Sequence, residues 1–165
     1  MTSVLIRVVL SSVGLMVVLG GCDAPPALTQ PPAEPPGSFG VAVDVLPGAG
    51  RTPDGSIEPA RYILEPDGSL RAATGVVQAG EFPRLVRRLD ADARARVYRL
   101  TLATGAHDPA PDRRVPAPDL FRPETPTTLV TVGWGEGRSA ASFDPDDPDA
   151  RALADELARL AWVKP

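Results

Sequence analysis

Apolar and polar residues alternate along several short stretches of the chain, a pattern that predicts β-strands. Residues 82–89 carry a weaker version of it, because their arginines also allow a helical turn. The alternating stretches are residues 39–46, 61–65, 70–74, 82–89, 127–132 and 138–143. Strands this short, several of them close together in sequence, favour an antiparallel sheet.

The clearest local signal lies between the second and third of these stretches. Pro66-Asp67-Gly68-Ser69 separates residues 61–65 from residues 70–74. Proline presets φ for the second position of a type I turn, and Gly68 can adopt the positive φ that closes a bulged hairpin. The sequence therefore predicts a β-hairpin here.

A period close to 3.6 residues appears at residues 90–104, between a capping residue and a stop. Asp90 is a suitable N-cap, and Gly105 suits the C-terminal end of a helix. Because residues 97–102 also alternate, a strand is the alternative. The predicted inward positions are Leu89, Ala93, Val97, Leu100 and Thr104, flanked by Ala95, Tyr98 and Leu102.

A second helix is predicted near the C-terminus, where Asp147 can cap it and Pro148 suits its first position. Its predicted inward positions are Ala150, Leu153, Ala154, Leu157, Leu160 and Ala161, with Trp162 closing the end. Hairpins combined with helices predict an α+β domain: a small antiparallel sheet with two helices packed on one face.

The chain opens with an apolar stretch that is too short to span a membrane. Residues 8–19 follow Arg7, and twelve helical residues rise only about 18 Å against a hydrocarbon core of about 30 Å. A secretory signal sequence fits this length better than a transmembrane helix.

The residues after this stretch, Leu19-Gly20-Gly21-Cys22, resemble the lipobox of bacterial lipoproteins. The resemblance implies that a lipoprotein signal peptidase removes residues 1–21 and that the Cys22 sulfur carries diacylglycerol, with further acylation of the new amino group. It also implies a domain in the cell envelope, outside the cytoplasm, held by acyl chains at the inner or the outer membrane. The alternatives are an ordinary secretory signal with a chance cysteine and an uncleaved anchor.

Proline-rich segments define the remaining organisation. Residues 23–37 hold three Pro-Pro pairs, which predicts an extended polyproline-like spacer reaching about 45 Å. A single domain then spans residues 38–165, with a second proline-rich stretch, predicted to be an irregular loop, at residues 106–126.

Composition and charge exclude several classes of protein. The 165 residues carry a formal net charge of −4, and removing residues 1–21 leaves 16 of the 17 basic side chains against all 21 acidic ones. Such a chain is not expected to bind nucleic acid or to be drawn electrostatically to anionic lipid. One cysteine and one histidine exclude an intramolecular disulfide and a Cys/His zinc site.

Three features suggest chemistry, and each has a plainer explanation. His107, the single histidine, lacks the context of a catalytic triad and is expected to be a solvated loop residue. The acidic residues 144–149 depart from EF-hand spacing and are explained by helix capping. Residues 133–137 lack the Lys-Ser/Thr of a P-loop and predict a hairpin turn. We therefore expect no catalytic residues, metal or cofactor.

Two features are candidate contact surfaces: Trp134, core-facing or exposed, and the basic residues Arg84, Arg87 and Arg88. The arginines alternatively form a solvated face. The sequence favours a non-catalytic binding or scaffolding domain with an unidentified envelope partner. One alternative is an inhibitor or regulator that inserts residues 107–126 into an envelope hydrolase. Another is a small hydrolase whose pocket brings two or more carboxylates together.

Overall fold

The computed structural model describes residues 28, 30–48, 59–75, 82–108, 114–116 and 125–162. The motif Leu19-Gly20-Gly21-Cys22 lies outside these residues. The strands are β1 (Gly40–Leu46), β2 (Ala60–Leu64), β3 (Ser69–Thr74), β4 (Arg84–Arg88), β5 (Thr127–Trp134) and β6 (Gly137–Phe143), and the helices are α1 (Ala91–Thr104) and α2 (Pro148–Trp162).

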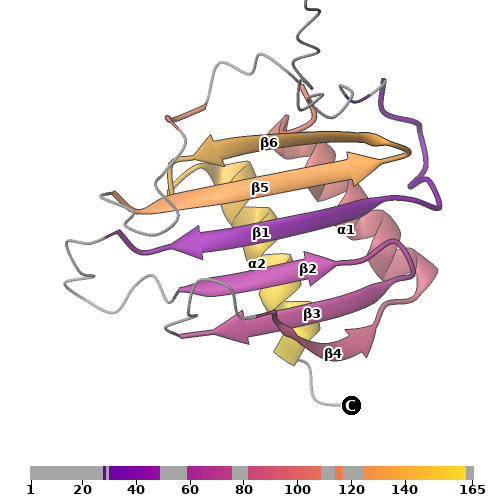
Figure 1. Ribbon diagram of the computed structural model, residues 1–165, viewed down its shortest axis with the longest axis horizontal. Helices are drawn as coiled ribbons and strands as arrows, with labels where there is room; N and C mark the ends of the chain where they lie inside the picture. Colours follow the sequence, from indigo (N-terminus) through magenta and orange to yellow (C-terminus); the bar gives the residue numbers. More distant parts are fainter. Residues whose placement is uncertain are drawn as a thin grey trace, which may run out of the picture.

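The strands form one sheet in the order β4-β3-β2-β1-β5-β6, and every neighbouring pair is antiparallel. Both helices lie behind the sheet in Figure 1, on one face of it. The predicted α+β fold is therefore confirmed. The structure also resolves two alternatives, because residues 84–88 form a strand and residues 91–104 form a helix.

The hairpin between β2 and β3 closes as the sequence predicts. Gly68 has a φ of 85°, and the backbone of Glu65 exchanges hydrogen bonds with Gly68 and Ser69. The Asp67 carboxylate accepts hydrogen bonds from the Ser69 amide at 2.9 Å and from its hydroxyl at 3.0 Å. These bonds lower the pKa of Asp67, so the turn is held by a carboxylate that stays ionised.

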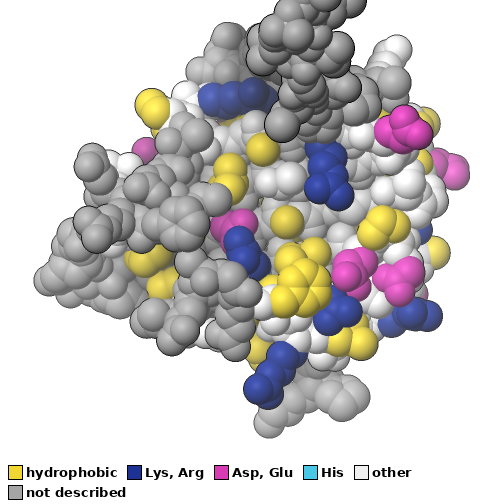
Figure 2. All heavy atoms as spheres, in the orientation of Figure 1, with side chains coloured by type: hydrophobic (Ala, Val, Ile, Leu, Met, Phe, Trp, Pro, Cys, Tyr) yellow, Lys and Arg dark blue, Asp and Glu magenta, His cyan; other side chains and the backbone are white. Residues whose placement is uncertain are grey.

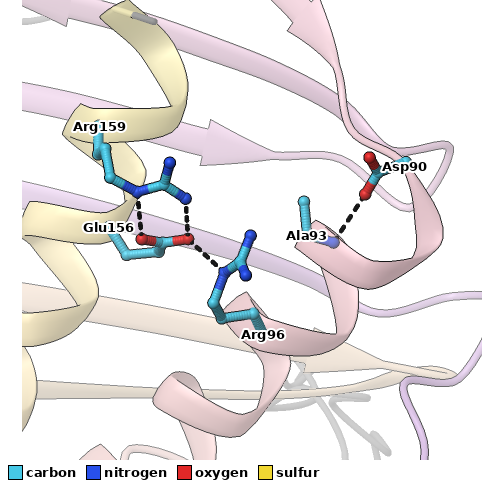
Figure 3. Close-up of polar contacts among 5 residues, drawn as sticks. All are labelled: Asp90, Ala93, Arg96, Glu156 and Arg159. Atoms are coloured by element: carbon cyan, nitrogen blue, oxygen red, sulfur yellow. Dashed lines mark hydrogen bonds and ion pairs between the residues drawn. The ribbon is translucent and has the colours of Figure 1, made fainter.

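The predicted caps of α1 are both present. The Asp90 carboxylate accepts a hydrogen bond from the Ala93 amide at 2.8 Å (Figure 3), and Gly105 ends the helix in the left-handed conformation. These are the standard ways to satisfy the free backbone groups at helix ends.

The buried face of α1 is rotated from the predicted one. Leu100 is only half-buried, whereas Tyr98 and Thr101 are buried. Thr101 can enter the core because its hydroxyl donates a hydrogen bond to the Val97 carbonyl at 2.9 Å. Its buried hydroxyl is therefore satisfied. The buried residues of α1 are Ala93, Val97, Tyr98, Thr101 and Thr104.

Helix α2 follows its prediction closely except at the end. Asp147 caps it by accepting hydrogen bonds from the amides of Asp149 at 3.1 Å and Ala150 at 3.0 Å. The expectation that Trp162 closes the helix end is wrong, because its side chain is 55% exposed. The buried residues are Ala150, Leu153, Leu157, Leu160 and Ala161, and Ala154 is half-buried.

One carboxylate joins the two helices. Glu156 of α2 accepts two hydrogen bonds from Arg159, at 2.8 and 2.6 Å, and one from Arg96 of α1 at 2.6 Å (Figure 3). The hydrogen bond from Arg159 is the main cause of a lowered pKa at Glu156, reinforced by Arg96 and partly offset by burial. The ionised carboxylate therefore stabilises the α1–α2 contact.

This arrangement predicts an acid sensitivity that depends on Glu156. Its pKa in the folded state lies below the unfolded value of about 4.3, so the stabilisation is complete above that value and is lost as pH falls through the folded pKa. Glu156→Gln should lower the free energy of unfolding at neutral pH by about 0.5–1 kcal/mol, because both arginines are half-exposed.

Urea denaturation from about pH 7 down to pH 3 measures this effect. The glutamine variant should converge with the wild type at the acid end, whereas the exposed neighbour variant Asp155→Asn should follow the wild type at neutral pH. A Glu156→Gln difference that stays constant with pH would show that the carboxylate charge is not the cause.

Candidate functional site

The helices cover one face of the sheet, and among the described residues no helix covers the other, which we call the open face. Val41 and Val43 of β1 are buried on the helix side, and the intervening Ala42 points the other way, because side chains alternate along a strand. Figure 1 views the molecule from the open side, and Figure 2 shows the same view, in which apolar and charged side chains of the described residues are interspersed.

A hollow of about 680 Å³ lies on this open face, and we call it the open-face hollow. Its floor is formed where Gly40 of β1 faces Gly133 of β5, with Ala42 facing Thr131 beside them. Two adjacent glycines leave the sheet surface without side chains at this point. The hollow therefore results from the glycines in β1 and β5.

A larger residue would be crowded at either glycine. A Cβ atom on Gly40 would lie 3.2 Å from the Leu64 carbonyl oxygen, and one on Gly133 would lie 3.2 Å from the Gly137 carbonyl oxygen. Both contacts are with backbone, which cannot move aside as a side chain can. Close backbone packing therefore favours glycine at both positions of the floor of the open-face hollow.

One side of the hollow is an apolar wall made by Ile63 and Phe82. Phe82 is 63% exposed, and the Arg71 guanidinium lies over its ring, 4.9 Å from the centroid. Arg71 also pairs with Glu65 at 3.1 Å. This cation–π contact holds an exposed aromatic ring beside the hollow without burying it.

The opposite side carries charge. Glu136 and Arg138 lie in and just after the β5–β6 turn, and both are exposed. Within the described part of the chain, the Arg138 guanidinium has no carboxylate partner in an ion pair. The hollow thus combines an apolar floor, an aromatic wall and a charged rim, a combination typical of binding sites.

Trp134 does not belong to an exposed contact surface. Its side chain is only 5% exposed, and its ring packs against the Tyr98 ring with centroids 6.3 Å apart. The alternation of buried Val130 and Val132 continues to Trp134, so period-two patterning would have placed it in the core. Of the two alternatives that the sequence leaves open for Trp134, the core-facing one is confirmed, and Trp134 is not an exposed contact residue.

His107 also lies closer to the core than the sequence suggests. It is half-buried, and its ring centroid is 6.2 Å from that of Trp134. The prediction of a solvated loop histidine is therefore wrong, because the residues after α1 fold back over the aromatic cluster.

The basic residues of β4 do not form one patch. Arg88 lies opposite Ser69 and Arg87 opposite Leu70, so these neighbours point to opposite faces of the sheet. Arg84 lies opposite Ala72, on the same side as Arg87, because β4 has an extra residue, Val86, at the register shift. Arg88 pairs with the Asp67 carboxylate at 2.9 Å. Arginines on an edge strand discourage pairing with another chain, which explains the cluster without a ligand.

The other edge of the sheet is partly covered by the second proline-rich stretch. The Val115 amide donates a hydrogen bond to the Ser142 carbonyl of β6 at 2.9 Å. This contact ties the middle of residues 106–126 to the sheet. Residues 109–113 and 117–124 lie outside the described residues.

The residues that the structure describes present neither a metal-binding cluster nor a membrane-spanning helix. These hold no group of three or more His, Cys, Asp or Glu side chains arranged to bind a metal ion, and none of their helices has both the length and the apolar character needed to cross a bilayer. The acidic residues 144–149 instead serve the backbone, because Asp144 accepts a hydrogen bond from the Asp146 amide at 2.9 Å.

No protein-family model matches the chain, and no curated protein is detectably similar to it.

Proposed function

We propose that this chain is a lipid-anchored bacterial envelope protein whose domain binds another envelope protein, without catalysis, through the open face of its sheet. The motif ending at Cys22 supports the lipid anchor. The open-face hollow supports the binding role, and it is the observation on which the proposal rests.

The geometry suits a partner that inserts an apolar group. Gly40 and Gly133 leave an apolar floor, and Phe82 adds a large exposed ring beside it. Burying apolar surface contributes about 25 cal/mol per Å², and exposed aromatic residues are enriched among those that dominate binding energy. Arg138 at the rim then favours a partner with an acidic group close to its inserted apolar side chain.

Site-specific photo-crosslinking in the native envelope tests this proposal. A photoreactive residue at Thr131, on the floor, should give a discrete protein adduct. The same photoreactive residue placed at position 73 of β3, which lies on the same face of the sheet but outside the hollow, should not give this adduct. Phe82→Ala, which removes an exposed side chain, should weaken the Thr131 adduct by about tenfold, corresponding to about 1.4 kcal/mol. Equal adducts at both positions, or an adduct indifferent to Phe82→Ala, would contradict binding at the hollow.

A further inference from the structure

The second half of the proline-rich spacer does not stand clear of the domain. Residues 30–37, which we call the strap, lie along α1. The Tyr98 hydroxyl donates a hydrogen bond to the Pro32 carbonyl at 2.7 Å, and the Arg94 guanidinium donates to the carbonyls of Pro36 at 2.8 Å and Gly37 at 3.0 Å. The predicted spacer of residues 23–37 is thus docked on α1 along the strap, which the sequence pattern does not indicate.

The contacts that hold the strap are built into the core. Arg94 and Tyr98 are four residues apart and so share one face of α1. Tyr98 is 1% exposed, and its ring packs edge-to-face on Phe39 with centroids 4.9 Å apart. Burial raises the pKa of Tyr98, so the hydroxyl keeps the proton that it donates. On the N-terminal side of the strap, Leu28 also packs against the hydrophobic core.

The prolines lower the cost of docking. Each proline fixes its own φ, so the unbound segment is already extended and loses little entropy when it docks. A proline-rich sequence offers carbonyl acceptors and few amide donors, and the strap contacts use it in this way, since Tyr98 and Arg94 are the donors. The composition that suggests a spacer thus also suits a docked strap.

Docking of the strap shortens the tether. Five residues separate Cys22 from Leu28, and a chain of that length reaches at most about 22 Å when fully extended. A free segment from Cys22 to Gly37 would reach about 54 Å by the same measure. Docking of the strap therefore shortens the maximum length of the tether by more than half.

We infer that the docked strap holds the domain close to the membrane, with the end of the sheet that bears β6 toward the lipid headgroups. This inference rests on the proposed lipid anchor at Cys22. In Figure 1 the strap (indigo) leaves the start of β1 and passes the β5–β6 turn toward the β6 edge. Its end is fixed at that turn, where the Gly135 amide donates a hydrogen bond to the Ser38 hydroxyl at 2.7 Å.

This orientation places the open-face hollow near the membrane. The β4 edge, which carries the exposed Leu85, points away from the bilayer, because it lies at the opposite end of the strand order. The open-face hollow extends across β2, β1, β5 and β6. It therefore faces sideways, close to the membrane, where a partner in the same membrane can reach it.

Neutron reflectometry measures the height of the domain directly. The mature chain is coupled through its Cys22 thiol to a maleimide lipid in a supported phosphatidylcholine bilayer. The double variant Tyr98→Phe/Arg94→Ala removes the side-chain hydrogen bonds that α1 donates to the strap but keeps the aromatic ring at position 98. The control is Arg99→Ala, a change at an exposed residue of the same helix. Circular dichroism confirms that each variant is folded.

The wild type and Arg99→Ala should show a gap between headgroups and protein of no more than about 22 Å, and the folded double variant a wider gap of up to about 54 Å. A wild-type gap above about 22 Å, or equal gaps in wild type and double variant, would overturn the inference. Because the coupling is chemical, the result does not depend on lipidation of Cys22 in cells.

Discussion

Replacing Trp134 with alanine is expected to lower the free energy of unfolding by about 3–5 kcal/mol. The side chain is 5% exposed and packs against Tyr98 where β5 meets the helix layer. Removing it leaves a cavity that the surrounding close-packed core cannot fill. A small domain has only about 5–15 kcal/mol of stability in total, so urea denaturation followed by far-UV circular dichroism should show an early transition.

The second tryptophan supplies a matched control. Trp162 is 55% exposed at the end of α2, so Trp162→Ala should change the free energy of unfolding by less than about 1 kcal/mol. Because both variants replace tryptophan with alanine, the difference between their free energies of unfolding reports the effect of burial. Equal losses in both, or a loss below about 1 kcal/mol at Trp134, would contradict its place in the core.

Replacing Cys22 with serine is expected to move the protein from the membrane fraction to the aqueous fraction. A serine hydroxyl is a far weaker nucleophile than a cysteine thiol, so the proposed lipid would not be attached. The mature chain retains a formal balance of −5, so electrostatic attraction to anionic lipid cannot replace the acyl chains.

Cell fractionation followed by immunoblotting measures this effect. The neighbouring variant Asp23→Ala leaves the four-residue motif intact and should stay in the membrane fraction. Retention of Cys22→Ser in the membrane at the wild-type level would contradict the anchor, whatever the domain binds.

Features that depend on neighbouring residues could be predicted from the sequence. The turn at Pro66 and Gly68 and the caps Asp90 and Asp147 are set by local backbone geometry, and all are present. The fold class follows from them, because hairpins and amphipathic helices combine in few ways.

Features that depend on residues far apart in the sequence could not be predicted from it. Val41 pairs with both Leu64 and Val132, and no local pattern indicates that β1 lies between β2 and β5. The open-face hollow exists only because this pairing brings Gly40 beside Gly133. The strap escaped prediction for the same reason, since its donors on α1 are more than fifty residues away in sequence.

The central claim is that Cys22 carries a lipid that tethers a binding domain to the membrane, and intact-mass analysis of protein purified from bacterial membranes tests it most directly. The account predicts a chain that begins at Cys22 and exceeds its unmodified mass by a diacylglycerol group, with or without one further acyl chain. An unmodified chain, or one that retains residues 1–21, would contradict it.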